Sequence, residues 1–359
     1  MTLTSTLSPA KKKFLSSINY FRGIAIVIIV AAHSYGIANW NVYKNPTVFE
    51  SFFYALNLNG SVFFIFISGF LYNHIFYDKF DYKKFIIKKA KYVLVPYLVC
   101  SAIPIFQAVF IDSRSNFLPD SLQDKPILAI FWYLVTGRAV YAYWYIPTIV
   151  LVFAISPLIN ALIRSQYLLY TILGLIPISM IIHRPVHNTN PLHSLVYFLP
   201  VYLLGIYSSI NQKKIYGFLR NNRVKFSLLV LAIGLGLVQV FIFKISGNFS
   251  KSFWSVTIPD VNLLQKILLC FLLMSVLDNY EDTDIPAMKK TAETSFAIYF
   301  IHPFLLKPLT LFVRSWGLDF QGNLFTLMIA TFFVVTISIA IAHLFKLVFQ
   351  RNSRYLIGW

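Results

Sequence analysis

Long apolar runs, separated by short polar connections, recur along the whole chain. Ten of them are long enough to cross a bilayer, centred near residues 28, 62, 101, 153, 175, 200, 235, 269, 302 and 334. A spanning helix needs about 20 predominantly apolar residues, and backbone polar groups in lipid must be bonded within their own segment. The strands of a membrane barrel would alternate apolar and polar residues, and that pattern is absent. The sequence therefore predicts an all-α polytopic membrane protein of about ten transmembrane helices.

One stretch breaks the regular alternation. Between Asp112 and Tyr143 a polar part is followed by an apolar piece of about ten residues that ends at Gly137 and Arg138. Such a piece is too short to span, so we expect a short interfacial or re-entrant segment between spans three and four. Arg138 would then lie near the outer mouth of the protein, either within an aromatic belt or in a polar lining for a sugar-sized acceptor.

Composition and charge agree with a membrane protein. Apolar residues make up 58% of the chain and charged residues 12%, with a mean hydropathy of +0.68. The formal charge is +18, and most Lys and Arg fall in alternate connections, which predicts that both termini are cytoplasmic. We expect no nucleic-acid partner, because no soluble basic module is present. We interpret residues 1–359 as a single membrane domain with cytoplasmic tails at 1–17 and 348–359.

Two ionisable residues share one face of the first apolar run, Ile18–Ile37. Arg22 and His33 are eleven positions apart. At about 100° per residue they return to nearly the same side of a helix, and about 16 Å separates them along its axis. An ionisable group inside hydrocarbon costs roughly 3 kcal/mol and marks a functional site by default. The pattern therefore indicates a cation near one membrane surface and a titratable base near the other, on one stripe.

Four motifs follow one another along the chain: RGIAIVIIVAAHS around the first-span pair, FFIFISGFLY from Phe63, WYIPTIVLVFAISPLI from Trp144 and SFAIYFIHPFLL from Ser295. Together they resemble the membrane proteins of acyltransferase family 3, the bacterial O-acyltransferases of cell-surface polysaccharides, over nearly the full chain. The resemblance implies a ten-helix integral protein. It also implies that the protein moves an acyl group, usually acetyl, from cytoplasmic acyl-CoA to a sugar hydroxyl.

The resemblance also implies site residues. The first-span Arg and His, here Arg22 and His33, are essential in the family, and a basic pair at the start of the third span handles the donor. Here that pair is Lys88 and Lys91 where many members carry Arg, so point charges replace the bidentate fork. Many members also carry an Asp just before the Phe run of the second span. Here Val62 precedes that run and no acid is present, which leaves the orienting partner of His33 open.

The chemistry of such a transfer assigns a role to each group. A base must take the proton of the attacking hydroxyl, and histidine is the side chain best suited to do so near neutral pH. We therefore interpret His33 as the base. The donor's phosphates are too charged to enter hydrocarbon, so Arg22, Lys88 and Lys91 would anchor them at the cytoplasmic end. Direct attack on the thioester and a two-step route through an acyl-enzyme on His33 or a nearby hydroxyl both stay open.

Further residues are candidates for the catalytic cavity or for packing. Tyr299 and His302 lie on one helix face beside a proline kink, and we interpret them as catalytic cavity residues or as interhelical hydrogen-bonding groups. The candidate substrate-binding residues are Ser68, Arg138 and Trp144. Ser68 would otherwise allow close helix packing, and Trp144 would otherwise anchor the protein at the membrane interface.

We therefore expect a multi-pass acyltransferase of the bacterial cytoplasmic membrane that uses acyl-CoA, with acetyl-CoA as the usual donor of the family. Its acceptor would be a polysaccharide or lipid-linked sugar, and its partners the lipid bilayer and the glycan-synthesis machinery. The sugar and the length of the acyl group, acetyl or longer such as succinyl, stay open. We expect no metal, because His183, His187 and His193 are irregularly spaced and lack a nearby carboxylate or Cys. The alternative is an exporter of a polysaccharide or lipid-linked sugar without acyl-transfer chemistry, although the paired halves typical of transporters are absent.

Overall fold

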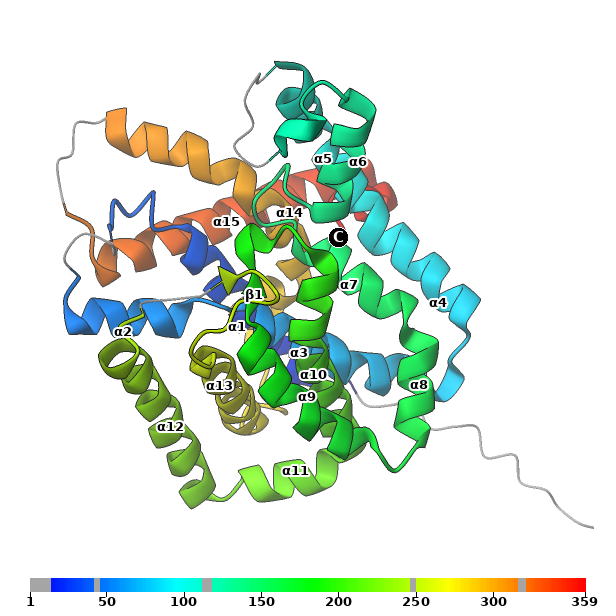
Figure 1. Ribbon diagram of the computed structural model, residues 1–359, viewed down its shortest axis with the longest axis vertical. Helices are drawn as coiled ribbons and strands as arrows, with labels where there is room; N and C mark the ends of the chain where they lie inside the picture. The colour runs from blue at the N-terminus through cyan, green and yellow to red at the C-terminus, as the bar shows by residue number, and fades with distance from the viewer. Residues whose placement is uncertain (1–13, 42–45, 112–117, 246–249, 316–320) are drawn as a thin grey trace, which may run out of the picture.

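The computed structural model describes residues 14–41, 46–111, 118–245, 250–315 and 321–359, and regular structure in these ranges is almost entirely helical (Figure 1). The first half of the chain forms α1 (Ser16–His33), α2 (Val48–Asn57), α3 (Ser61–Leu71), α4 (Tyr82–Lys89), α5 (Val95–Phe106), α6 (Pro126–Thr136), α7 (Tyr145–Ala154), α8 (Ser156–Arg164) and α9 (Leu168–Ile182). The second half forms α10 (Pro191–Ile210), α11 (Gln212–Leu219), α12 (Asn222–Leu237), α13 (Val261–Asp278), α14 (Pro286–Ser315), α15 (Leu324–Phe349) and α16 (Ser353–Leu356). Two short strands, β1 (Arg184–Pro185) and β2 (Ser250–Lys251), pair in parallel.

The described ranges contain eight helical segments that are long and apolar enough to cross a bilayer. A ninth is the pair α7 and α8, bent by 56°, if the two are counted as one span. The tenth expected run forms α9, whose 15 residues are fewer than those of the eight long segments. The all-α, polytopic fold predicted from the sequence is thus confirmed.

Two of the long segments bury little of their surface in the protein. The segment Asn222–Ile242 has a mean hydropathy of 2.2 and is only 17% buried, and the segment Tyr82–Ile111 has a hydropathy of 2.0 and is 22% buried. Apolar surface of this extent is stable only against another apolar phase. These faces therefore indicate contact with lipid.

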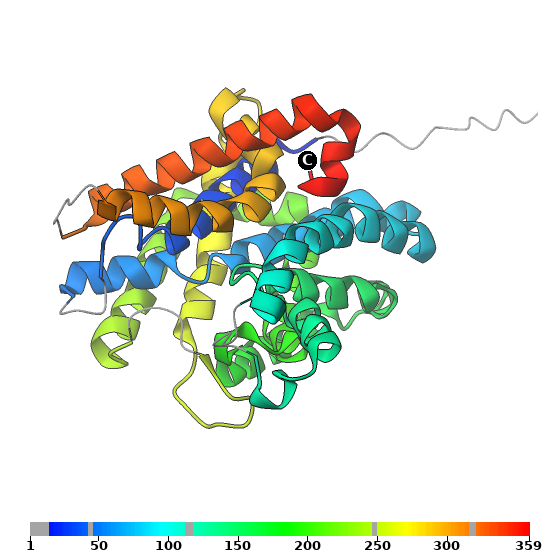
Figure 2. The same ribbon diagram turned by 90° about the horizontal axis from the view of Figure 1, so that it is seen from above.

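The centre of the bundle is formed by α1, α3 and α10, which lie in the middle of the view in Figure 1. α1 packs against α14, α3, α13 and α15, and α14 and α15 run side by side in Figure 2. α3 and α10 approach most closely where glycines face backbone. A Cβ on Gly69 would lie 2.0 Å from the Tyr202 carbonyl oxygen, and one on Gly205 would lie 2.1 Å from that of Phe66. Gly69 and Gly205 therefore allow the close packing of α3 against α10.

The second span is broken between α2 and α3. Asn59 has a left-handed backbone, with φ of 61°, and the last turn of α2 leaves carbonyls without helical partners. The ammonium of Lys266 on α13, a fully buried side chain, donates hydrogen bonds to two of these carbonyls, those of Ala55 and Leu56. A cation at a helix C-terminus is favourable, so Lys266 stabilises the break that places Asn59 beside the cavity described below.

The short apolar piece near residue 130 forms α6, a helix of 11 residues, which agrees with the predicted length. It ends at Thr136 and is followed by Gly137, where φ of 69° favours a residue without a Cβ. The chain then turns into the bundle, and the Tyr143 hydroxyl donates to the Phe300 carbonyl of α14 at 2.7 Å. The C-terminal tail folds as well. After Gln350, with φ of 48°, the chain reverses and α16 packs on α5.

Candidate active site

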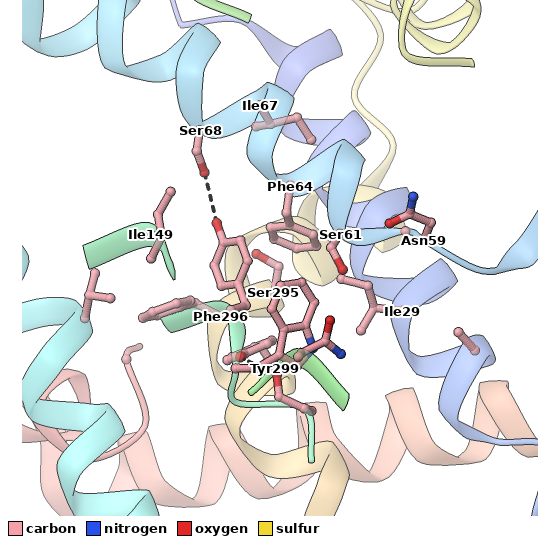
Figure 3. A pocket seen from close by; sticks show the side chains of 18 of the residues that line it. Ile29, Asn59, Ser61, Phe64, Ile67, Ser68, Ile149, Ser295, Phe296 and Tyr299 are labelled. Atoms are coloured by element: carbon pink, nitrogen blue, oxygen red, sulfur yellow. Dashed lines mark hydrogen bonds between the residues drawn. The ribbon is translucent and has the colours of Figure 1, made fainter. Parts of the chain in front are cut away.

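A cavity of about 620 Å³ lies between α1, α3, α7 and α14. Its middle is lined by Ile29, Phe64, Ser68 and Tyr299, whose side chains surround one space in Figure 3. We call one end of the cavity the Arg22 end and the other the His33 end. Among the lining residues we assign Lys89 and Arg354 to the end marked by Arg22. To the end marked by His33 we assign Tyr141, which packs against His33, Arg184, which acts on it electrostatically, and with them Arg138 and Trp144.

The first-span pair opens on this common space. Arg22, Ile29 and His33 all line it, as their spacing of seven and four residues along one helix face predicts. Ile29 separates the two ionisable groups, so the stripe is polar at its ends and apolar in its middle. Arg22 and His33 therefore line the same cavity, from positions about 16 Å apart along α1.

His33 is bonded to a second histidine. Its Nδ1 lies 3.1 Å from Nε2 of His302, and the planes of the two rings differ by 2°. The ring centroids are 5.3 Å apart, which exceeds the nitrogen distance by about the two ring radii. The rings therefore lie edge to edge in one plane, as a linear hydrogen bond between imidazoles requires. His302 itself is fully buried.

The backbone fixes which nitrogen carries each proton. His302 Nδ1 lies 2.9 Å from the carbonyl oxygen of Ile298, which can only accept, so this nitrogen is the donor. Nε2 of a neutral His302 then accepts, and Nδ1 of His33 must donate. The lone pair of a neutral His33 is consequently on Nε2, to which no described residue is hydrogen-bonded. The bond from His302 to the Ile298 carbonyl and the bond between the two imidazoles thus leave Nε2 of His33 as an unprotonated base that no described residue occupies.

The tyrosine beside His302 ties helix to loop. The Tyr299 hydroxyl donates to the carbonyl of Ala142 at 2.7 Å, and its ring lines the cavity. Tyr143 makes the reverse connection to α14 through Phe300. These two bonds hold the segment 138–144 against α14. Tyr299 therefore lines the cavity, and its hydroxyl bonds a loop where the sequence suggested a bond between helices.

Three basic side chains line the Arg22 end. Arg22 donates to a side-chain amide one turn earlier at 2.9 Å, and its Nε has no hydrogen-bond partner in the described part of the chain. Lys89 Nζ lies 4.6 Å from the centroid of the Phe153 ring, and the Arg354 guanidinium lies 3.9 Å from that of Tyr92. These contacts are all with neutral groups, which suits the three charges to binding an anion.

The basic residues predicted at this end are not the ones that line it. Lys88 and Lys91 are exposed and are not among the described lining residues, whereas Lys89 is. A helical turn of π type, Ala90–Leu94, follows Lys89 directly and changes the phase of the helix face. The acid that acts electrostatically on Arg22 is Glu293, which is exposed and outside the lining.

Two arginines line the His33 end. The Arg184 guanidinium lies 4.7 Å from the Trp144 ring, and the Tyr141 ring packs edge-on against His33 at 4.8 Å. Burial lowers the pKa of Arg138 and that of Arg184 from their ordinary values, and Asp260 partly offsets the effect on Arg184. Both guanidiniums stay charged. Trp144 is 7% exposed, so it is a buried wall of the cavity and not a surface anchor.

Ser68 lies in the middle of the cavity. Its hydroxyl is 3.2 Å from that of Tyr145, the contact drawn as a dashed line in Figure 3. Ser68 and Tyr145 line the same cavity as Arg22 and His33. Ser68 is therefore a lining residue, while its neighbour Gly69 makes the helix contact.

His183, His187 and His193, the three histidines of the loop, have different surroundings. His183 Nε2 lies 2.6 Å from the Ile258 carbonyl oxygen, His193 Nε2 lies 3.0 Å from the carbonyl of His183, and His187 lines the cavity. Within the described ranges, no three His, Cys, Asp or Glu residues are grouped as metal ligands would be.

Several lining residues carried no usable local signal. Arg184 stands in a loop beside His183, and Lys89 is one of five lysines in Tyr82–Lys89 and the two residues after it. Arg354 follows the last span and reaches the cavity only because the chain reverses at Gln350. The pairing of His33 with His302 joins residues 269 positions apart.

The chain was compared with known proteins. A family model described as an acyltransferase domain, that of acyltransferase family 3, matches residues 15–343. The matched residues include His33 and His302 and end before Arg354. No curated protein and no solved structure matches the chain.

Proposed function

The chain belongs to acyltransferase family 3, and from this premise we propose that it transfers an acyl group, acetyl in the usual case, from acyl-CoA to a hydroxyl of a polysaccharide or lipid-linked sugar. The observation that carries the proposal is the shared cavity, which is lined by Arg22, Lys89 and Arg354 and also by His33, whose Nε2 is free to act as a base. A donor with a charged head and a thin arm fits that distribution of charge.

The donor would enter from the Arg22 end. Arg22, Lys89 and Arg354 would bind the phosphates of CoA, because charge-assisted hydrogen bonds to phosphate are among the strongest available. The pantetheine arm would pass Ile29 and Phe64 and bring the thioester to His33, about 16 Å away along α1. This assignment replaces Lys88 and Lys91 with Lys89 and Arg354.

The acceptor would enter from the His33 end. His33 Nε2 would take the proton of the sugar hydroxyl as its oxygen attacks the thioester carbonyl. The carbon–sulfur bond then breaks, and the imidazolium returns the proton to the departing CoA thiolate. His302 would accept from Nδ1 of His33 throughout and so keep Nε2 directed at the cavity. No redox partner or metal is needed for this balance.

A covalent route uses the same cavity. The acyl group would first pass to His33 or to a hydroxyl such as that of Ser68, and then to the sugar. Incubation with labelled acyl-CoA in the absence of acceptor distinguishes the routes, because only the covalent route leaves label on the protein.

We further propose a bacterial cytoplasmic membrane location with both termini in the cytoplasm, which places the Arg22 end at the inner surface where acyl-CoA is found. Neither substrate would then need to cross the bilayer. The distribution of Lys and Arg along the chain supports this orientation.

The test uses purified protein in liposomes with labelled acyl-CoA and a candidate glycan. Thioester cleavage that depends on the glycan, with label recovered on the sugar, is the expected result. Replacement His33→Ala should lower kcat about 10²- to 10⁴-fold while the protein still inserts and unfolds normally. Transport of sugar without release of CoA would instead indicate the exporter, and full activity of His33→Ala would refute the role of the base.

A further inference from the structure

The charged side chains that line the cavity in the described ranges are all basic. They are Arg22, Lys89, Arg138, Arg184 and Arg354. The proposed donor accounts for the cations at the Arg22 end. Arg138 and Arg184, at the His33 end, have no role in binding the donor, because its phosphates would lie at the opposite end of the passage.

Arg184 is held as a rigid, incompletely satisfied donor. It is 6% exposed. Its Nη1 donates to Asn59 Oδ1 at 3.3 Å and its Nη2 to Asn188 Oδ1 at 3.0 Å. Its Nε has no hydrogen-bond partner in the described part of the chain. Since guanidinium has five N–H donors, the two amides leave several unused, and the ring of Trp144 fixes the plane in which they lie.

The carboxylate that acts on Arg184 is occupied elsewhere. Asp260 accepts from the Tyr197 hydroxyl at 2.7 Å and from the backbone N–H of Leu263 at 3.2 Å, as the N-cap of α13. It does not line the cavity. Asp260 therefore compensates part of the charge of Arg184 without lining the cavity, and no described acid lines the cavity itself.

Arg138 adds a second buried guanidinium to the same end. It is 8% exposed and follows Gly137, whose left-handed backbone turns the chain inward. Burying cations without an acid at the cavity wall is costly unless an anion completes the site. Arginine is also the side chain whose planar fork matches carboxylate and phosphate oxygens.

We propose that Arg184 and Arg138 bind an oxyanion of the acceptor, so that the substrate class is an acidic glycan: a sugar carrying a carboxylate or a phosphate close to the hydroxyl that is acylated. This inference rests on the proposed function. The anion would anchor the sugar at the His33 end with its hydroxyl beside Nε2 of His33. A neutral sugar would leave the unused donors of Arg184 without an anion, and it would bind more weakly for that reason.

The experiment compares three acceptors of matched structure: a neutral hexose glycoside, its uronic acid and its phosphate ester. Wild-type protein should acylate the acidic acceptors with a KM about 10- to 100-fold below that of the neutral one. The variant Arg184→Gln should raise the KM for acidic acceptors by the same factor without raising the KM for the neutral acceptor, so that the preference for acidic acceptors is lost. Arg164→Gln, an exposed arginine at the end of α8, is the matched control.

A second measurement needs no variant. Free glucuronate should inhibit the wild-type protein competitively against the acceptor and not against acyl-CoA. Inorganic phosphate should compete with the acceptor too, and also with acyl-CoA, because the cations of the Arg22 end are proposed to bind the phosphates of CoA. Stronger inhibition by glucuronate indicates an acidic sugar, and stronger inhibition by phosphate indicates a sugar phosphate of a lipid carrier. Equal KM for all three acceptors in an active enzyme, or competition only against acyl-CoA, refutes the anion site while leaving the acyltransferase intact. Absence of transfer to every acceptor tested refutes the proposed function itself.

Discussion

Replacement of His302 tests the hydrogen-bonded chain that runs from Ile298 to the cavity. His302→Phe keeps a flat ring in a fully buried position but removes the acceptor at 3.1 Å from Nδ1 of His33. The imidazole of His33 is then free to rotate and to adopt either tautomer. We expect slower transfer, because part of the population no longer presents a bare nitrogen to the hydroxyl.

The size of the effect follows from the charge that develops on His33. In the ground state the lost bond joins two neutral rings and contributes about 1 kcal/mol. As His33 takes the proton, the same bond becomes charge-assisted and contributes about 1.5–3 kcal/mol. Only the difference, about 0.5–2 kcal/mol, raises the barrier when the bond is lost, so at about 1.4 kcal/mol per factor of ten the rate should fall about 2- to 30-fold. The loss should appear in kcat, because the bond strengthens only when the base is protonated.

The assay is acyl transfer from labelled acyl-CoA in liposomes, with kcat and both KM values measured. His302→Gln is the rescue variant, because its amide oxygen can accept from His33 Nδ1 and should recover much of the lost rate. His343→Phe, a histidine of α15 outside the described lining, should leave kcat unchanged. Thermal unfolding of each variant separates a loss of fold from a loss of rate.

Two results would refute this reasoning. An unchanged kcat in folded His302→Phe would show that the second imidazole does not position the first. Equal loss in the Phe and Gln variants would show that His302 acts by packing and not as an acceptor.

Two further predictions concern the Arg22 end and the broken span. Arg354→Gln should raise the KM for acyl-CoA about tenfold without changing the KM for acceptor, because it removes one charge-assisted contact to phosphate. The control is Lys88→Gln, at an exposed lysine outside the described lining. An equal effect of the two variants would contradict the assignment. Lys266→Met should lower the free energy of unfolding by about 1.5–3 kcal/mol, because the carbonyls of Ala55 and Leu56 lose a charged donor. Unchanged thermal unfolding of Lys266→Met would show that the break in the second span is stabilised in another way.

The sequence predicted what depends on one helix. The positions of the spans follow from apolar length, and the common face of Arg22 and His33 follows from helical periodicity, which the cavity confirms. The end of α6 at Gly137 was also predictable, since glycine tolerates the left-handed backbone there. Each of these features is decided by neighbours within a few turns.

What the sequence did not predict depends on packing between distant segments. Nothing local indicates that His302 faces His33, and their roles were assigned separately. Lys88 and Lys91 were predicted as donor anchors, but Lys89 is the lysine of this segment among the described lining residues, and the rings of Phe76, Phe85 and Phe153 lie around its ammonium. The place of Arg354 depends on a chain reversal that no glycine marks.

His33 is hydrogen-bonded to His302, a side chain without negative charge, in a cavity whose charged lining residues are all basic among those described. A carboxylate beside His33 would lie near Arg184, which acts electrostatically on His33, and an acid there would pair with the guanidinium as readily as with the imidazole. Such a pair would use the donors that an acidic acceptor needs. His302, whose ring is oriented by its hydrogen bond to the Ile298 carbonyl, accepts the bond from His33 without adding a negative charge to the site. The absence of an acid before the Phe run and the presence of two arginines at the His33 end are therefore consistent parts of one site, in which the negative charge arrives with the substrate.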